Sequence, residues 1–120
     1  MGIEVKNFES PDETRPFEGR GRADVVTIGG REIGKGVFEP GWSWRENVKP
    51  IAGTESCEFP HLMYVISGRM SVKMDDGQQV ELRAGDVAFI PPGHDADVIG
   101  DEPCVTVDLA EDDTDYAKRS

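Results

Sequence analysis

The chain has 120 residues, of which 37% are hydrophobic and 31% charged, with 14 glycines, 8 prolines and a net charge of −11. This length supports one hydrophobic core, and the polar, turn-rich composition excludes a fibre, a coiled coil or a disordered chain. The negative charge repels phosphate backbones and anionic lipid surfaces, so neither nucleic acid nor a membrane is expected as a partner.

The hydropathy pattern and the cysteine content bear on location. No apolar run approaches the roughly 20 residues of a membrane span, and the first residues lack the basic and apolar regions of a secretory signal. Two cysteines are too few for a disulfide scaffold. We therefore expect a cytoplasmic protein, with Cys104 as a buried thiol.

The chain divides into an arm, a domain and a tail. Residues 1–24 are interrupted by Pro11 and Pro16 and predict an extended arm that contributes little to the core. Residues 25–110 form the predicted domain. Residues 111–120 begin with an acidic cluster and are expected to be a solvated tail.

Short runs of valine, isoleucine, phenylalanine and methionine separated by glycine, proline and aspartate predict an all-β domain with almost no helix. The clearest signal is Asp76-Gly77, because an Asp-Gly pair between alternating segments favours a tight hairpin turn. The predicted strands are 24–28, 33–38, 57–67, 70–74, 79–82, 86–90, 96–99 and 105–109. About eight antiparallel strands must protect their edges, so we expect a small barrel or jelly roll that forms a homodimer.

Two segments resemble the paired motifs of the cupin superfamily. Residues 85–93 fit the opening G-x5-P-x-G of the second motif, and residues 64–68 resemble the end of the first. The phrases at 41–44, 49–54 and 91–95 resemble a group of small single-domain cupins of unassigned activity. The resemblance implies a cupin-type double-stranded β-helix, or jelly-roll barrel, with a metal or ligand in its mouth.

The residues at the usual cupin metal positions are altered. Family members commonly use three histidines and one glutamate. Aligning the first motif puts Glu55 and Cys57 at its two histidine positions and His61 at its glutamate position. In the second motif Ala96 takes the histidine position, and His94 lies two residues earlier.

Strand parity favours a shared site for four of these residues. Glu55, Cys57 and His61 are all odd-numbered, so in an extended segment they project from one face. Together with His94 they form a candidate metal site that suits Zn²⁺, with Fe²⁺ or Ni²⁺ less suited. The alternative is no metal, with Cys57 a buried apolar residue, His61 a hydrogen-bonded pocket histidine and His94 a loop residue.

Both alternatives predict a barrel mouth that binds a compact small molecule. With a metal, three protein ligands and an open position would support a metal-dependent enzyme, with Asp95 or Glu55 as a candidate base. Without a metal, the protein would be a ligand-binding or sensing module. The predicted pocket residues are Met63, Val65, Met70, Phe89, Val98 and Trp44. Trp42 and Trp44, placed here on one strand face, are either core aromatics or a wall over the mouth.

Overall fold

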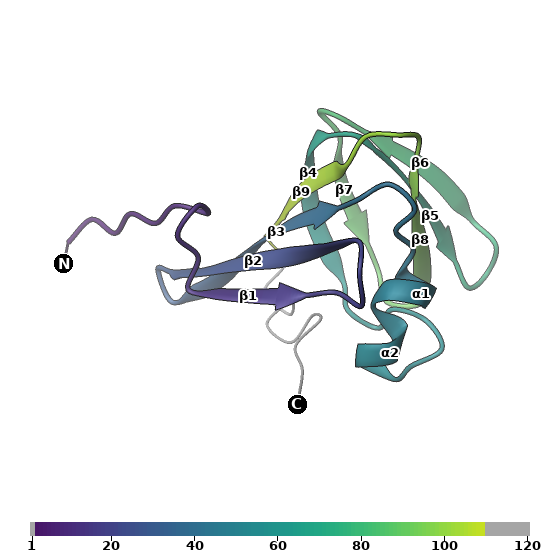
Figure 1. The fold of residues 1–120 in the computed structure, drawn as a ribbon, viewed down its shortest axis with the longest axis horizontal. Coiled ribbons are helices and arrows are strands. Elements are labelled where there is room, and N and C mark those ends of the chain that lie inside the picture. The colour runs from purple at the N-terminus through teal and green to yellow at the C-terminus, as the bar shows by residue number, and fades with distance from the viewer. Residues whose placement is uncertain (1, 110–120) are drawn as a thin grey trace.

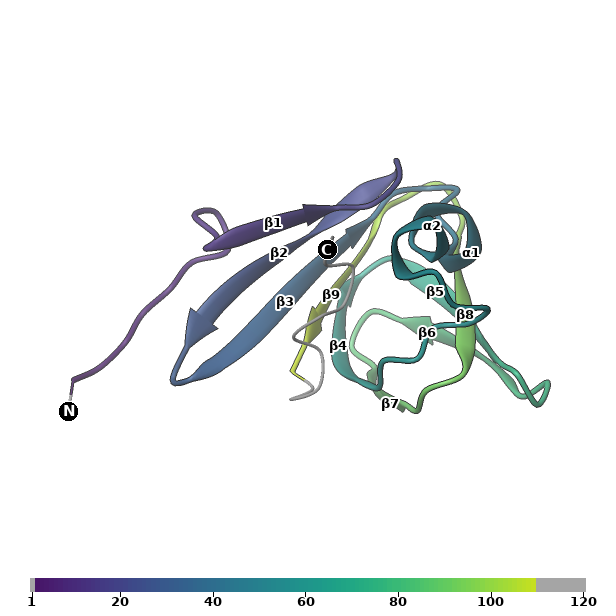
Figure 2. The ribbon, with the colours of Figure 1, turned by 90° about the horizontal axis from the view of Figure 1, so that it is seen from below.

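Strands dominate residues 2–109, the part of the chain that the computed structural model describes. They are β1 (Glu13–Pro16), β2 (Gly21–Ile28), β3 (Arg31–Phe38), β4 (His61–Ser67), β5 (Arg69–Met74), β6 (Gln79–Arg83), β7 (Val87–Ile90), β8 (His94–Ile99) and β9 (Cys104–Asp108). One antiparallel sheet has the order β1-β2-β3-β9-β4-β7 and the other the order β6-β5-β8. The sheets enclose the core, while β1, β2 and β3 extend to one side (Figure 1, Figure 2). The expected all-β jelly-roll architecture is confirmed.

Alternation along β4 shows how the sequence positions the interior. His61, Met63 and Val65 are buried, whereas Leu62 and Tyr64 are 41% and 45% exposed. Successive side chains of a strand point to opposite faces, so the odd-numbered residues of β4 line the inside of the barrel. The polar side chain of His61 is thereby placed among apolar neighbours.

Two short helices, α1 (Trp44–Asn47) and α2 (Lys49–Ala52), lie at the end of the barrel beside β8 (Figure 1). Ser43 is the N-cap of α1, and its hydroxyl accepts a hydrogen bond from the backbone N–H of Glu46. The prediction that Trp42 and Trp44 share a strand face is wrong, because Trp44 is the first residue of α1. Both indoles are 2% exposed and belong to the core.

The amino-terminal segment contributes more than an arm. β1 pairs with β2, and Phe17 and Ala23 are buried in the core cluster. The Phe17 ring stacks on Phe38 with a centroid distance of 5.3 Å. The expectation that residues 1–24 add little to the core is therefore wrong, because one aromatic side chain after Pro16 reaches the interior. The predicted tail, 111–120, lies outside the described residues.

The segment before β4 also differs from the prediction. The strand expected over 57–67 begins only at His61, because Pro60 has no backbone N–H for a strand ladder. Cys57 instead forms an isolated bridge with His94. Among residues 2–109, no helix has the length and hydrophobicity needed to cross a membrane.

Candidate functional site

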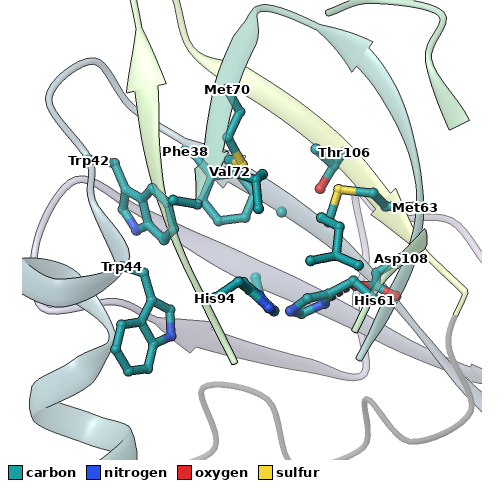
Figure 3. Close-up of a pocket in the computed structure, with 15 residues that line it drawn as sticks. Phe38, Trp42, Trp44, His61, Met63, Met70, Val72, His94, Thr106 and Asp108 are labelled. Atoms are coloured by element: carbon teal, nitrogen blue, oxygen red, sulfur yellow. Dashed lines mark hydrogen bonds and ion pairs between the residues drawn. The ribbon is translucent and has the colours of Figure 1, made fainter. Parts of the chain in front are cut away.

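A cavity of about 40 Å³ lies between the two sheets (Figure 3), room for about three water molecules. Its walls are mainly apolar and aromatic, and its polar side chains come from β4, β8 and β9. The residues that line it are Ala23, Gly34, Gly36, Phe38, Trp42, Trp44, His61, Met63, Met70, Val72, Ile90, His94, Ala96, Thr106 and Asp108. An apolar pocket with a few convergent polar groups is the usual form of a small-molecule site.

His61 is oriented by a carboxylate. Its Nδ1 contacts Oδ2 of Asp108, at the end of β9, and both side chains are at least nine-tenths buried. A carboxylate oxygen accepts, so Nδ1 carries the hydrogen and Nε2 keeps its lone pair when the ring is neutral. That Nε2 lies 3.6 Å from Sγ of Cys57. Asp108 thus orients His61 so that Nε2 faces the thiol.

Backbone hydrogen bonds bring Cys57 next to His94. The N–H of Cys57 donates to the carbonyl of His94, and the N–H of Gly93 donates to the carbonyl of Cys57, each at 2.7 Å. Gly93 has φ +93°, a left-handed conformation that glycine adopts without a steric penalty. The turn after Pro91-Pro92 therefore holds the segment around Cys57 against the start of β8.

His94 is also held through Nδ1, which lies 2.8 Å from the carbonyl oxygen of Pro91. A carbonyl only accepts, so this Nδ1 carries the hydrogen and Nε2 is left unprotonated in the neutral ring. Burial, followed by the charge of His61, lowers the pKa of His94 to about 4. The ring is consequently neutral at pH 7, as metal ligation requires. The rings of His61 and His94 lie edge to face, with centroids 5.1 Å apart and an interplanar angle of 69° (Figure 3).

The geometry fits a divalent ion. One donor atom each from Cys57, His61 and His94 lies within 4.8 Å of the other two, and all three residues are buried. In a tetrahedral zinc site, Zn–S and Zn–N bonds of about 2.3 and 2.05 Å put sulfur and nitrogen about 3.6 Å apart. The 3.6 Å between Cys57 Sγ and His61 Nε2 equals that separation.

Glu55 does not join the cluster. Its side chain is 97% exposed and pairs with Lys49 at 3.0 Å. Glu55 does not share a face with Cys57 and His61, because residues 54–56 form a bend instead of an extended strand. Asp95 is also unsuited to act as a base in the cavity, because its carboxylate accepts a hydrogen bond from Arg45 and does not line the cavity.

Three of the predicted pocket residues, Met63, Met70 and Trp44, line the cavity. The other three do not. Val65 is fully buried beyond it, and Val98 packs against the edge of the core. Phe89 is 68% exposed because it pairs with the outward-facing Leu62, and opposite residues of an antiparallel pair share a face.

Sequence reasoning missed Asp108 and Phe38, whereas Trp42, predicted as either a core aromatic or part of a wall over the mouth, is buried and lines the cavity. The sequence carries no clear signal for Asp108, because the apolar alternation of this strand lies on Val105 and Val107, and only the structure shows that the even-numbered residues are the buried ones. A charged residue at an inward position of a strand requires a partner. That partner is one of the two histidines of the chain.

A family model for the EutQ-like cupin domain matches residues 21–107, which span most of the two sheets. The chain belongs to the EutQ-like cupin family. A comparison with curated proteins gives no match. In this cupin, Ala96 at the usual second-motif histidine position lines the same cavity as His94, since both are on the inner face of β8.

Solved structures of several cupin-like proteins are similar in fold. The polyketide cyclase RemF from Streptomyces resistomycificus superposes with a TM-score of 0.63 at 17% identity, covering 98% of this chain and 94% of that one. A protein of unknown function from Acidithiobacillus ferrooxidans gives 0.61 at 22% identity, with coverages of 83% and 88%. A double-stranded β-helix protein from Klebsiella pneumoniae gives 0.59 at 21% identity, with coverages of 94% and 93%. At these identities the likeness shows the fold alone.

Proposed function

We propose that this cupin binds one Zn²⁺ through Cys57, His61 and His94 and uses the adjoining cavity to bind a compact small molecule. The observation that carries the proposal is the orientation of the two imidazoles. Asp108 and the Pro91 carbonyl each engage an Nδ1, which leaves both Nε2 atoms to ligate. The donor set of one thiolate and two imidazoles matches zinc better than Fe²⁺ or Ni²⁺.

The three ligands leave one tetrahedral position for a water or a ligand atom. A zinc ion with an open position lowers the pKa of a bound water or polarises a carbonyl. The residues of the chain orient the three metal-ligating side chains and exclude bulk water with aromatic walls. They supply few other polar groups to the cavity. Asp108, the one carboxylate among the lining residues, is engaged by His61. These features support ligand binding as the basic function, with metal-dependent catalysis as an extension of it.

Metal analysis of untagged protein tests the proposal. We expect about one equivalent of zinc per chain in the wild type and none in His61→Ala. Glu55→Gln is the matched control, because this carboxylate is exposed and outside the cluster. Circular dichroism of each variant verifies that it folds. A wild-type protein that takes up no zinc from a buffered zinc solution overturns the metal site.

Cobalt replacement tests the thiolate separately. Co²⁺ bound to a thiolate gives a near-ultraviolet charge-transfer band. We expect this band in the wild type and in Cys104→Ser, and we expect it to be absent in Cys57→Ser. Since Cys57 and Cys104 are the two cysteines of the chain and both are buried, they form a matched pair. A band that persists in Cys57→Ser would rule out ligation by Cys57.

A metal-free ligand-binding or sensing module is the second candidate. The observation that favours it is the contact between Cys57 Sγ and His61 Nε2, which is within hydrogen-bond range for sulfur. Together with Asp108, the polar groups of His61 can be satisfied without an ion. Absence of zinc with retained ligand binding would select this candidate.

We also infer that the protein is a homodimer, from the edge of the larger sheet. Within residues 2–109, β7 pairs only with β4, and its Val87 and Phe89 side chains are 71% and 68% exposed. An exposed apolar edge strand favours pairing with a second copy. Light scattering should give twice the chain mass for the wild type and a lower mass for Phe89→Lys. A monomeric wild type overturns the inference.

A further inference from the structure

Within residues 2–109, the indole N–H groups of Trp42 and Trp44 are buried without a hydrogen-bond acceptor. Buried tryptophans usually find a partner for this group, and an unmet buried donor costs about 1–3 kcal/mol. Both residues are 2% exposed, and both line the cavity. Two unmet donors in the wall of one cavity indicate that an acceptor arrives with the ligand.

Trp44 is the better placed of the two donors. In Figure 3 its indole nitrogen is on the edge of the ring that faces His94. Its position is fixed by the Ser43 cap at the start of α1 and by Asn47, whose side-chain oxygen accepts from the backbone N–H of Ser43 at 3.0 Å. Two local hydrogen bonds therefore hold the backbone that carries this donor, whose indole nitrogen lies toward His94 in Figure 3.

The charges and walls of the cavity restrict the ligand further. Zn²⁺ with one thiolate and two neutral imidazoles carries one net positive charge, and the Asp108 carboxylate on His61 balances it. The open zinc position would therefore favour an anionic or strongly dipolar oxygen through coordination, not through net charge. The apolar part of the ligand would meet Met63, Met70 and Val72. A volume of about 40 Å³, room for about three water molecules, limits the ligand to a few non-hydrogen atoms.

We propose that the cavity selects compact carboxylates or carbonyl compounds, with one oxygen at the open zinc position and an acceptor oxygen that receives the Trp44 indole N–H. This inference rests on the proposed function of the cavity as a small-molecule site. It adds a specificity-determining residue, Trp44, and a ligand class, short-chain oxo or carboxylic compounds. Trp42 contributes wall area to the same cavity.

Three probes of equal size and branching separate acceptors from donors. Acetate and acetone each present acceptor oxygens, whereas isopropylammonium presents only donors, and all three have four non-hydrogen atoms. The chain has two tryptophans, so an ¹H–¹⁵N spectrum gives two indole signals, which the Trp42→Phe and Trp44→Phe variants assign. We expect acetate, and more weakly acetone, to shift the Trp44 signal saturably. Isopropylammonium should leave it unchanged.

Affinity measurements test the role of the donor. Loss of a hydrogen bond to a charged acceptor should weaken acetate binding about tenfold or more in Trp44→Phe. Trp42→Phe removes an equally buried indole N–H and some wall area but no proposed contact with the acceptor oxygen, so it should weaken acetate binding less than Trp44→Phe does. Equal binding of isopropylammonium, an unshifted Trp44 signal at saturating acetate, or equal losses in both variants overturns the proposal.

Failure of this inference can be told apart from failure of the zinc site. If zinc binds at one equivalent but acetate leaves the Trp44 signal unmoved, the metal site stands and the ligand class is wrong. If the zinc-free protein still shows the acetate-dependent shift of Trp44, the donor role stands and the metal site is not needed for binding.

Discussion

The carboxylate of Asp108 contacts Nδ1 of His61 across 47 residues of sequence, at the point where β9 and β4 pair side by side. Asp108 is 7% exposed, so its carboxylate contacts this histidine and the interior of the barrel and has little contact with water. Such a carboxylate fixes the ring orientation and raises the basicity of the opposite nitrogen. The strength of the proposed metal site therefore depends on a residue that does not touch the metal.

Asp108→Asn should weaken zinc binding by about 10- to 100-fold, the usual effect of losing an outer carboxylate partner of a ligating histidine. A competition titration with a zinc chelator measures the change. Asp97→Asn is the control, because Asp97 is on the outer side of β8 and pairs with Arg45. Unchanged zinc affinity in Asp108→Asn would show that this carboxylate does not support a metal ligand.

Burial of the Cys104 thiol makes stability fall at alkaline pH. Desolvation raises its pKa from 9.0 to about 11. Above pH 9 the unfolded chain loses this proton while the folded chain keeps it. The group therefore stabilises the fold below pH 9 and loses that contribution as pH rises toward 11, at no more than about 1.4 kcal/mol per pH unit.

Urea unfolding at pH 8 and pH 10.5 measures this effect. The wild type should lose more stability between the two values than Cys104→Ala does, although the variant is less stable at pH 8 because of its cavity. The native protein should also react slowly with a thiol reagent at pH 8, since both cysteines are buried. Equal pH dependence of the two proteins would contradict the assignment to Cys104.

Gly68 joins β4 to β5 at a position that no other residue fits. Its φ is +78°, and a Cβ there would lie 2.3 Å from the carbonyl oxygen of Pro103 and 2.6 Å from Cα of Cys104. Gly68→Ala should cost about 1–2 kcal/mol for the left-handed conformation and a further 1–3 kcal/mol for the backbone overlap. Gly77 also has a positive φ, +98°, but a Cβ there would have no atom within 4 Å. Gly77→Ala should therefore lose only the stability associated with the left-handed conformation. Denaturant unfolding of the wild type and of both variants measures the two losses of stability.

Local patterns in the sequence were sufficient for the hairpin. The segments predicted at 70–74 and 79–82 correspond to β5 and β6, with Met70 paired to Leu82. Asp-Gly turn chemistry and alternation are both properties of neighbouring residues, so the prediction needed no knowledge of the rest of the chain. The same holds for the odd-numbered interior residues of β4, including His61.

Features that depend on distant pairing were not predictable in the same way. The sequence pattern predicts Phe89 in the pocket, but the register of β7 against β4 places Ile90 opposite His61 and turns Phe89 outward. A shift of one residue exchanges the two faces of a strand. Asp108 reaches His61 only because β9 pairs with β4, and no local pattern specifies that pairing.

The N-cap of α1 gives a last prediction, because it connects helix geometry to the cavity. The Ser43 hydroxyl accepts from the backbone N–H of Glu46 at 3.3 Å, and Trp44 follows directly. Ser43→Ala removes this cap and should destabilise the protein by about 1 kcal/mol. It should also broaden or shift the indole signal of Trp44 without affecting zinc content, since no metal ligand is on α1.

Ser10→Ala is the control substitution. Ser10 is exposed in a bend near the start of the chain, and it does not cap α1. It should leave both stability and the Trp44 signal unchanged. If Ser43→Ala lowers stability but the Trp44 signal is unaltered, the cap supports the fold without positioning the indole. Trp44 would then be held by the packing of its ring against the core. In that case Ser43→Ala should bind acetate as well as the wild type does.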